Sequence, residues 1–167
     1  LAIILIILIA VGRLKKAVAK IRQSEKFLQT LLDTSPVPIQ ITSKDEGRFL
    51  MANKAACELH RLTQEELLEH RSEEIYFDPS ERKAVMQSTE TAGHLEAMDL
   101  HARRIGTGEE RWLSFNSRII DYQGEGAILS VTQDITDRKE SELINERLRR
   151  GLEATGIGTW AVDMEAR

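Results

Sequence analysis

Apolar and polar residues alternate over two stretches in the second half of the chain, and this alternation then gives way at once to helical spacing. Residues 111–120 and 127–133 alternate with the period of a β-strand and are separated by a glycine-containing turn. After Thr136 the apolar residues lie along one side of a helix: Leu143, Ile144, Leu148 and Leu152. We therefore predict a hairpin whose second strand runs directly into a helix.

The region before this hairpin predicts two short strands, several helices and a third strand. The expected elements are strands 39–43 and 48–52, helices 54–60, 64–69 and 81–92, and strand 95–104. Asn53 can cap the first of these helices, and Gly93 can end the third. Thr63 and Glu66 form a capping box for the second.

The first twelve residues are an uncharged apolar run, and a cluster of cations follows them: Arg13, Lys15, Lys16, Lys20 and Arg22. Such a run is too short to cross a bilayer, which takes about 20 residues. Because the chain begins with Leu rather than Met, we expect the run to be the cytoplasmic end of a transmembrane helix, with the cations on the cytoplasmic side. The alternatives are a buried core helix and a signal peptide, although a signal peptide carries its cations before the apolar run.

Between residues 14 and 32 the chain has the spacing of a coiled-coil seam. The seam consists of Leu14, Val18, Ile21, Leu28 and Leu32, with a polar interruption at Glu25. This spacing favours a parallel dimer, and the alternative is an amphipathic helix that packs on its own domain. Pro36 and Pro38 then end the helix, because proline cannot donate to the helical hydrogen bonds.

Three segments resemble the PAS family, the sensory modules of bacterial signalling proteins. They are residues 47–56, residues 63–67, and the Asp134-Ile135-Thr136 motif after the last strand. Where the family often has a glycine, this chain has Arg61, so the bend there forms without glycine. The resemblance implies an α+β fold: a PAS-like five-stranded antiparallel sheet with a helical flank, preceded by a membrane-proximal helix and followed by an output helix.

The expected organisation has five parts. They are the end of a transmembrane helix (1–12), a juxtamembrane coiled-coil helix (13–34), the PAS domain (35–137), a linker helix (138–152) and the start of a second PAS domain (153–167). A short internal similarity supports the last part, because Leu28 and Leu32 are matched 120 residues later by Leu148 and Leu152. The match is short, so chance is the alternative.

Charge and motif content exclude several classes of function. The net charge of −4 and the scattered cations give no nucleic-acid groove, so we expect no nucleic-acid partner. The sequence has no phosphate-binding glycine loop, no paired metal-ligand spacing and no catalytic triad pattern. We therefore expect no enzymatic activity in this chain, whereas the full-length protein that the resemblance implies would be a sensor histidine kinase or a diguanylate cyclase.

The residues that could hold a metal or a prosthetic group are dispersed. Four histidines, His60, His70, His94 and His101, are interpreted as ordinary surface residues. The single Cys57 suits a reducing cytoplasm and is interpreted as a buried, inert thiol, and the cysteine motif of flavin-binding light sensors is absent. Haem-binding relatives carry a histidine on the helix that corresponds to residues 81–92, which contains none. The sequence leaves the cofactor unknown.

The third strand decides what a pocket between sheet and helices would hold. One face carries Met98, Leu100 and Ala102, and the other carries Asp99, His101 and Arg103. If the charged face points toward the helices, the pocket would bind a small anion such as a carboxylate. If the apolar face points toward the helices, the pocket is apolar or filled by side chains. We favour the apolar face, because burying three ionisable groups without partners costs several kcal/mol.

Two further sets of residues are candidates for function. Phe115 and Ser117 share one face of a strand, as do Ser130 and Thr132, and these four are predicted to orient a ligand. By resemblance to the family motif, Asp134 and Thr136 join the last strand to the output helix and relay the signal. Thr136 is also expected to cap the free amides of that helix.

We therefore expect a sensing and relay module on the cytoplasmic face of the inner membrane. Its expected partners are a second copy of the chain, the membrane through the amino-terminal helix, a downstream output domain in the same protein and, as an open question, a small-molecule ligand. The alternatives are a fragment of a sensor histidine kinase or cyclic-dinucleotide cyclase, and a purely structural dimerisation spacer with a filled core.

Overall fold

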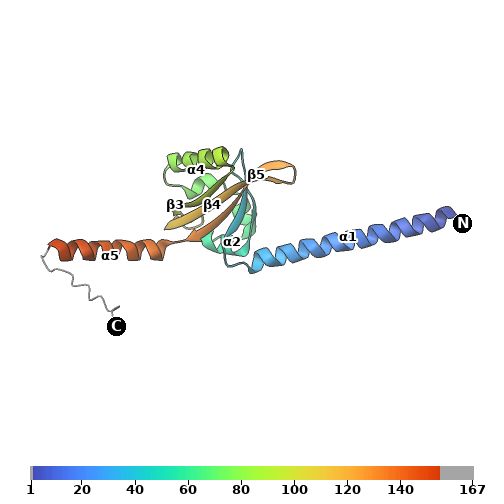
Figure 1. Ribbon diagram of the computed structural model, residues 1–167, viewed down its shortest axis with the longest axis horizontal. Helices are drawn as coiled ribbons and strands as arrows, with labels where there is room; N and C mark the ends of the chain where they lie inside the picture. Colours follow the sequence, from blue (N-terminus) through green and yellow to red (C-terminus); the bar gives the residue numbers. More distant parts are fainter. Residues whose placement is uncertain (1, 155–167) are drawn as a thin grey trace, which may run out of the picture.

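The fold is built around a five-stranded antiparallel sheet, seen in a computed structural model that describes residues 2–154 (Figure 1). The strands are β1 (Ile39–Ser43), β2 (Phe49–Ala52), β3 (His94–Arg103), β4 (Glu110–Tyr122) and β5 (Glu125–Asp134). They lie in the order β2-β1-β5-β4-β3. The first and last strands of the domain are therefore neighbours at the centre of the sheet.

The pairing of β1 with β5 brings the two ends of the domain together. Ile39, at the start of β1, lies opposite Val131, near the end of β5. The backbone N–H of Thr132 donates to the carbonyl of Pro38 at 3.0 Å. The chain therefore enters and leaves the sheet at the same place.

Short helices cover one face of the sheet. They are α2 (Lys54–His60), α3 (Gln64–Leu68), the 3₁₀ helix η1 (Ser72–Ile75) and α4 (Pro79–Ala92). The buried core between them and the sheet has as its largest apolar side chains Phe49, Leu67, Ile75, Leu100 and Leu113. Burial of this apolar surface is the main force that holds the layers together.

Two long helices extend away from the domain in opposite directions: α1 (Ala2–Thr34) and α5 (Thr136–Ala154) (Figure 1). Large apolar side chains are exposed along both, namely Leu14, Val18, Ile21 and Leu28 on α1 and Leu143, Ile144 and Leu148 on α5. Within residues 2–154, no helix has a segment long and apolar enough to cross a bilayer.

The predicted fold class and element order are confirmed. The bounds of β1 and α2 agree with the prediction, and the bounds of the other predicted elements of the domain differ by one or two residues. Asn53 caps α2, Thr63 and Glu66 form the capping box of α3, and Gly93 ends α4 in the left-handed conformation. The helix η1 was not predicted. A second PAS domain was expected to begin at residue 153. Residues 153 and 154 belong to α5, and the expected segment from residue 155 on lies outside the described residues.

Strand β3 turns its apolar face inward, as predicted. Leu100 and Ala102 are buried, and Met98 packs against the core. A bulge around Ala97, which has a φ of 47°, shifts the register between Leu95 and Met98. The charged face of β3 lies on the side of the sheet away from the short helices.

Candidate functional site

The space between the sheet and the short helices is almost filled. A cavity of about 20 Å³ remains, which is room for about one water molecule. Phe115, Ser117 and Ser130, three of the four residues predicted to bind a ligand, line this cavity and are buried. Thr132, the fourth, is also buried but lines a different space.

The hydroxyl of Ser117 is already used within the fold. Thr89 of α4 donates to the carbonyl of Val85 at 2.8 Å, so the contact of 2.9 Å between the hydroxyls of Thr89 and Ser117 has Ser117 as its donor. Both side chains are buried. Ser117 therefore fastens α4 to the sheet.

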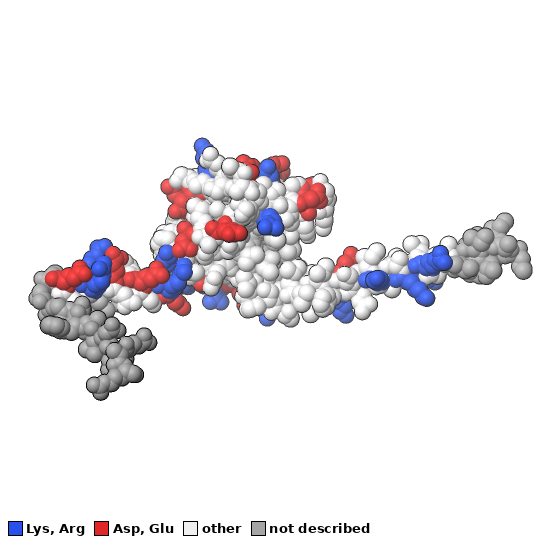
Figure 2. Space-filling model, in the orientation of Figure 1, with Lys and Arg blue, Asp and Glu red and all other residues white. Residues whose placement is uncertain are grey.

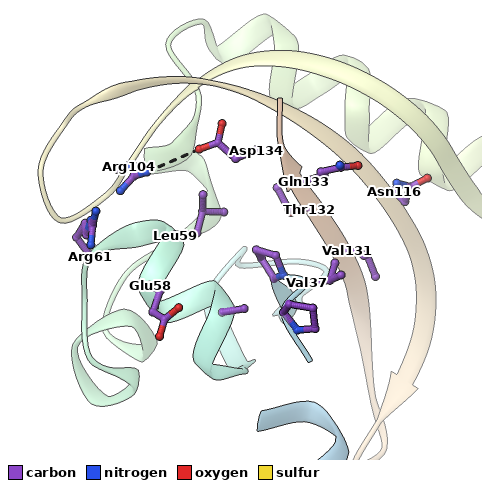
Figure 3. A pocket seen from close by; sticks show the side chains of 13 residues that line it. Val37, Glu58, Leu59, Arg61, Arg104, Asn116, Val131, Thr132, Gln133 and Asp134 are labelled. Atoms are coloured by element: carbon purple, nitrogen blue, oxygen red, sulfur yellow. Dashed lines mark ion pairs between the residues drawn. The ribbon is translucent and has the colours of Figure 1, made fainter. Parts of the chain in front are cut away.

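A larger space, the linker groove, opens beside the segment between α1 and β1. Its volume is about 640 Å³, within the usual range of small-molecule sites. Its lining consists of residues 36–38, Ala55, Glu58 and Leu59 of α2, Arg61 directly after α2, Arg104, Asn116 and residues 131–134 of β5 (Figure 3). Five segments far apart in the sequence form it, so no local sequence pattern predicts it.

An ion-pair cluster closes one end of the linker groove. A carboxylate oxygen of Asp134, Oδ2, lies 3.7 Å from Nη2 of Arg104 and 3.9 Å from Nε of Arg111. Figure 3 shows Arg104 directed at Asp134. Glu109 also pairs with both arginines. The end of β5 is thus held to the β3–β4 hairpin by charge.

The other oxygen of Asp134 organises what we call the C-terminal joint, made of Asp134, Thr136 and Trp112. Oδ1 of Asp134 accepts from the Thr136 backbone N–H at 3.0 Å and from its hydroxyl at 2.6 Å. The Thr136 hydroxyl oxygen in turn accepts from the backbone N–H of Trp112 at 3.0 Å. Two side chains therefore connect β5, β4 and the first turn of α5.

This arrangement differs from the predicted role of Thr136. Its hydroxyl binds the backbone of β4, and Asp134 satisfies the first amide of α5. The difference arises because β4 brings the Trp112 N–H within 3.0 Å of the Thr136 hydroxyl. These two residues are 24 positions apart, so a local sequence pattern does not display their contact. The two residues predicted to form the joint are brought together, with the capping role on Asp134.

The outer face of the sheet supports the same turn of α5. Asp99 of β3 pairs with Lys139 at 2.8 Å and with Arg138 at 3.3 Å. The ammonium of Lys139 lies 5.6 Å from the ring centre of Trp112, a cation–π contact. His101 packs between the rings of Trp112 and Phe77, with ring centres 4.9 and 4.8 Å away. The first turn of α5 is thus held from two sides.

A second junction, the N-terminal joint, holds α1 and depends on Asn53. Its side-chain amide donates to the carbonyls of Leu32 at 3.0 Å and Val37 at 2.9 Å. Its carbonyl oxygen accepts from the N–H groups of Ile39 at 2.9 Å and Ala56 at 3.0 Å. Asn53 is 1% exposed. The residue predicted only as a helix cap therefore also fixes the last turn of α1 and the start of β1.

The prediction that all four histidines are surface residues is wrong for His60. This side chain is 1% exposed, and neither ring nitrogen has a hydrogen-bond partner among the described residues. Burial, with a smaller contribution from the Arg104 charge, lowers the pKa of His60 to about 4. Ala56, Leu59 and His60 are the buried residues of α2, and their helical spacing is the signal that could have identified the burial.

Cys57 is half-buried rather than fully buried, and this partial burial raises the pKa of its thiol. Within the described part of the chain, no group of three or more His, Cys, Asp or Glu side chains is placed to hold a metal ion.

Comparison with known proteins places this geometry in one family. The PAS fold family matches residues 32–140. A methyl sulfide methyltransferase-associated sensor from Methanosarcina acetivorans is 29% identical over 143 residues, which cover 83% of this chain and 14% of that sensor. The chain thus spans a small part of the length of this relative.

Solved structures agree on the fold. The PAS domain of an HTR-like protein from Haloarcula marismortui has a TM-score of 0.62 and 18% identity, over 72% of this chain and 99% of that one. The PAS domain of a two-component sensor histidine kinase has a TM-score of 0.60 and 15% identity, over 68% and 97%. With the match over residues 32–140 and the observed strand order, the chain belongs to the PAS domain family, whose members are sensory rather than catalytic modules.

Proposed function

We propose that this PAS domain is the sensing and relay module of a membrane-anchored signal-transduction protein. In this proposal α1 carries movement from the membrane side, and α5 passes it to an output domain, a histidine kinase or a diguanylate cyclase. One observation carries the proposal: each long helix is bonded to the domain at the adjoining turn, while its apolar residues farther out are exposed. Such helices can transmit a shift or a rotation.

The amino-terminal part of α1 supports membrane anchoring. The apolar run of residues 1–12 continues into the cation cluster without a break in the helix from Ala2 to Thr34. Figure 2 shows these cations on the part of α1 far from the domain. Cations that flank an apolar helix mark its cytoplasmic side, so the PAS domain would lie inside the cell.

The exposed seam on α1 supports a parallel homodimer, because apolar side chains at this spacing are buried when two such helices pair. Sedimentation of residues 13–154 tests this. We expect an equilibrium between monomer and dimer in which the dimer fraction rises with protein concentration. Ile21→Lys should give a monomer, whereas Gln23→Lys, off the seam, should not. A wild-type monomer unaffected by Ile21→Lys would exclude the dimer.

Insertions in α5 test the relay itself. Adding residues between Lys139 and Leu152 in the full-length receptor rotates everything beyond by about 100° per residue, and seven residues nearly restore the phase. Output should change with one to three inserted residues and recover near seven. Output that is the same at every insertion length would contradict a relay through helix phase.

The filled interior favours a second candidate, a structural dimerisation spacer without a ligand. The remaining cavity of about 20 Å³ is far smaller than usual ligand sites. Native mass spectrometry of the purified chain separates the two candidates. A small molecule retained at a defined stoichiometry supports a sensor, whereas a ligand-free chain whose helix insertions leave the output unchanged supports the spacer.

A further inference from the structure

Arg61 has a backbone conformation that glycine adopts with less strain. It follows α2 with φ 58° and ψ 40°, in the left-handed region. Its side chain is exposed and has no hydrogen bond or ion pair among the described residues. Neither the backbone nor a contact within the fold explains an arginine at this position. Strained residues with this character often serve a binding function.

Arg61 lies beside a second arginine of the linker groove. The hairpin after Arg104 packs directly on the end of α2, where the Gly106 N–H donates to the His60 carbonyl at 3.0 Å. A Cβ on Gly106 would lie only 2.8 Å from the Arg61 carbonyl oxygen, so only glycine permits this approach. Arg61 and Arg104 therefore lie at the same end of the groove (Figure 3).

The rest of the linker groove is less charged. The two carboxylates that line it have partners already, because Glu58 pairs with Lys54 at 3.8 Å and Asp134 with Arg104 and Arg111. Apolar surface comes from the linker prolines, Val37 and Leu59. The hydroxyl of Thr132 is buried and has no hydrogen-bond partner in the described chain. Among the described residues, the groove thus combines the unpaired cation of Arg61, the unpaired hydroxyl of Thr132 and an apolar wall.

We propose that the linker groove binds a small organic carboxylate. The carboxylate lies between Arg61 and Arg104, and the apolar part of the molecule rests on Val37 and Leu59. The ligand competes with Asp134 for Arg104 and so weakens the ion pair that holds the end of β5. A regulatory effect of the ligand rests on the proposed relay function, whereas binding of the ligand to the groove does not.

The test measures binding of 4-phenylbutyrate to the 167-residue chain by isothermal titration. The neutral 4-phenylbutyramide and inorganic phosphate serve as comparison compounds. We expect the carboxylate to bind more tightly than both. Arg61→Gly should weaken its binding about tenfold, the loss of one charge-assisted hydrogen bond.

Gln123→Gly is the matched control, because Gln123 is exposed, has a φ of 57° and lies in the distant β4–β5 turn. Both glycine variants should unfold at no lower urea concentration than the wild type, which separates lost binding from misfolding. Equal affinity in Arg61→Gly and Gln123→Gly would overturn the site. Equal binding of phosphate or of the amide would overturn the assignment to organic carboxylates.

Hydrogen exchange tests the competition for Arg104. With 4-phenylbutyrate bound, the Thr136 amide, which donates to Asp134, should exchange faster, and the Ala56 amide, which donates to Asn53, should not. Unchanged exchange at Thr136 with saturating ligand would overturn this coupling. Because these measurements need no output domain, their failure is distinguishable from failure of the helix-insertion test.

Discussion

The two joints that connect the domain to its long helices lie at the same end of the sheet but use different chemistry. At the N-terminal joint, one neutral amide, Asn53, is 1% exposed and makes four hydrogen bonds. At the C-terminal joint, the Asp134 side chain is 32% exposed and pairs with two arginines. Salt and competing anions screen exposed ion pairs much more than buried hydrogen bonds. The N-terminal joint is therefore suited to be fixed, and the C-terminal joint to be adjusted.

Removal of Asn53 should have the largest effect. Asn53→Ala deletes four hydrogen bonds, at about 1 kcal/mol each, so we expect a loss of about 4 kcal/mol in the free energy of unfolding. Asn53→Ser keeps a cap acceptor for the Ala56 amide and should lose less, about 3 kcal/mol. Urea unfolding followed by circular dichroism measures both. Equal losses in the two variants would show that the bond from the Ala56 amide contributes nothing.

Acid should lower the free energy of unfolding of the domain, because the His60 side chain of α2 is buried. The pKa of His60 falls from 6.5 to about 4 on folding, so the unfolded chain takes up a proton that the folded one rejects. Stability is then retained above pH 6.5 and falls as the pH drops toward 4, by about 3 kcal/mol in all.

The variant His60→Leu provides the control for this acid sensitivity, because it cannot titrate. Other groups titrate alike in both proteins, so the difference between their unfolding free energies isolates His60. We expect the wild type to lose stability relative to the variant between pH 6.5 and 4. Parallel curves over that interval would contradict the effect of burial on His60.

Asp134→Ala should cost about 2 kcal/mol, because it removes two hydrogen bonds and two partly exposed ion pairs. Asp134→Asn keeps an acceptor for Thr136 and isolates the ionic part. Half-molar salt should narrow the gap between wild type and Asp134→Asn, since it screens the ion pairs, and leave the effect of Asn53→Ala unchanged. A salt response of the same size at both joints would remove the contrast between them.

The smallest effect is expected at Thr136. Thr136→Val keeps the shape but leaves the Trp112 N–H without its acceptor, at a cost of about 1 kcal/mol. Thr136→Ser retains the hydroxyl and should stay close to wild type. Thermal unfolding compares them, and a serine variant as unstable as the valine variant would indicate that packing of the methyl group matters more than the hydrogen bonds.

The joints also show where sequence-based reasoning succeeds. The strands and helices follow from local patterns: alternation in residues 111–120, the cap at Asn53 and the stop at Gly93 all concern neighbouring residues. The family motif likewise placed Asp134 and Thr136 together. These features depend on interactions within a few positions of the chain, which the sequence displays directly.

The remaining features depend on distant residues. The acceptors of Asn53 are backbone carbonyls, one of them 21 positions away, and every residue has such a carbonyl. The burial of His60 depends on the chain around Arg104 folding over it. The sequence identifies Arg61 as a departure from the family pattern, but its place in the linker groove depends on four other segments. The near-complete filling of the interior depends on the volumes of side chains from many elements. The alternation of apolar and polar residues does not give these volumes.

The length of α1 gives the N-terminal joint a mechanical property of its own. The helix has 33 residues and is about 50 Å long at 1.5 Å per residue. Pivoted at the turn that Asn53 holds, it acts as a lever arm whose distal end travels about 4 Å for a tilt of about 5°. The hydrogen bonds at the pivot would move by well under 1 Å in such a tilt. Because the N-terminal joint is fixed, a large motion of the distal end of α1 reaches the domain as a small displacement. The C-terminal joint, which is held by exposed ion pairs, can adjust to this displacement.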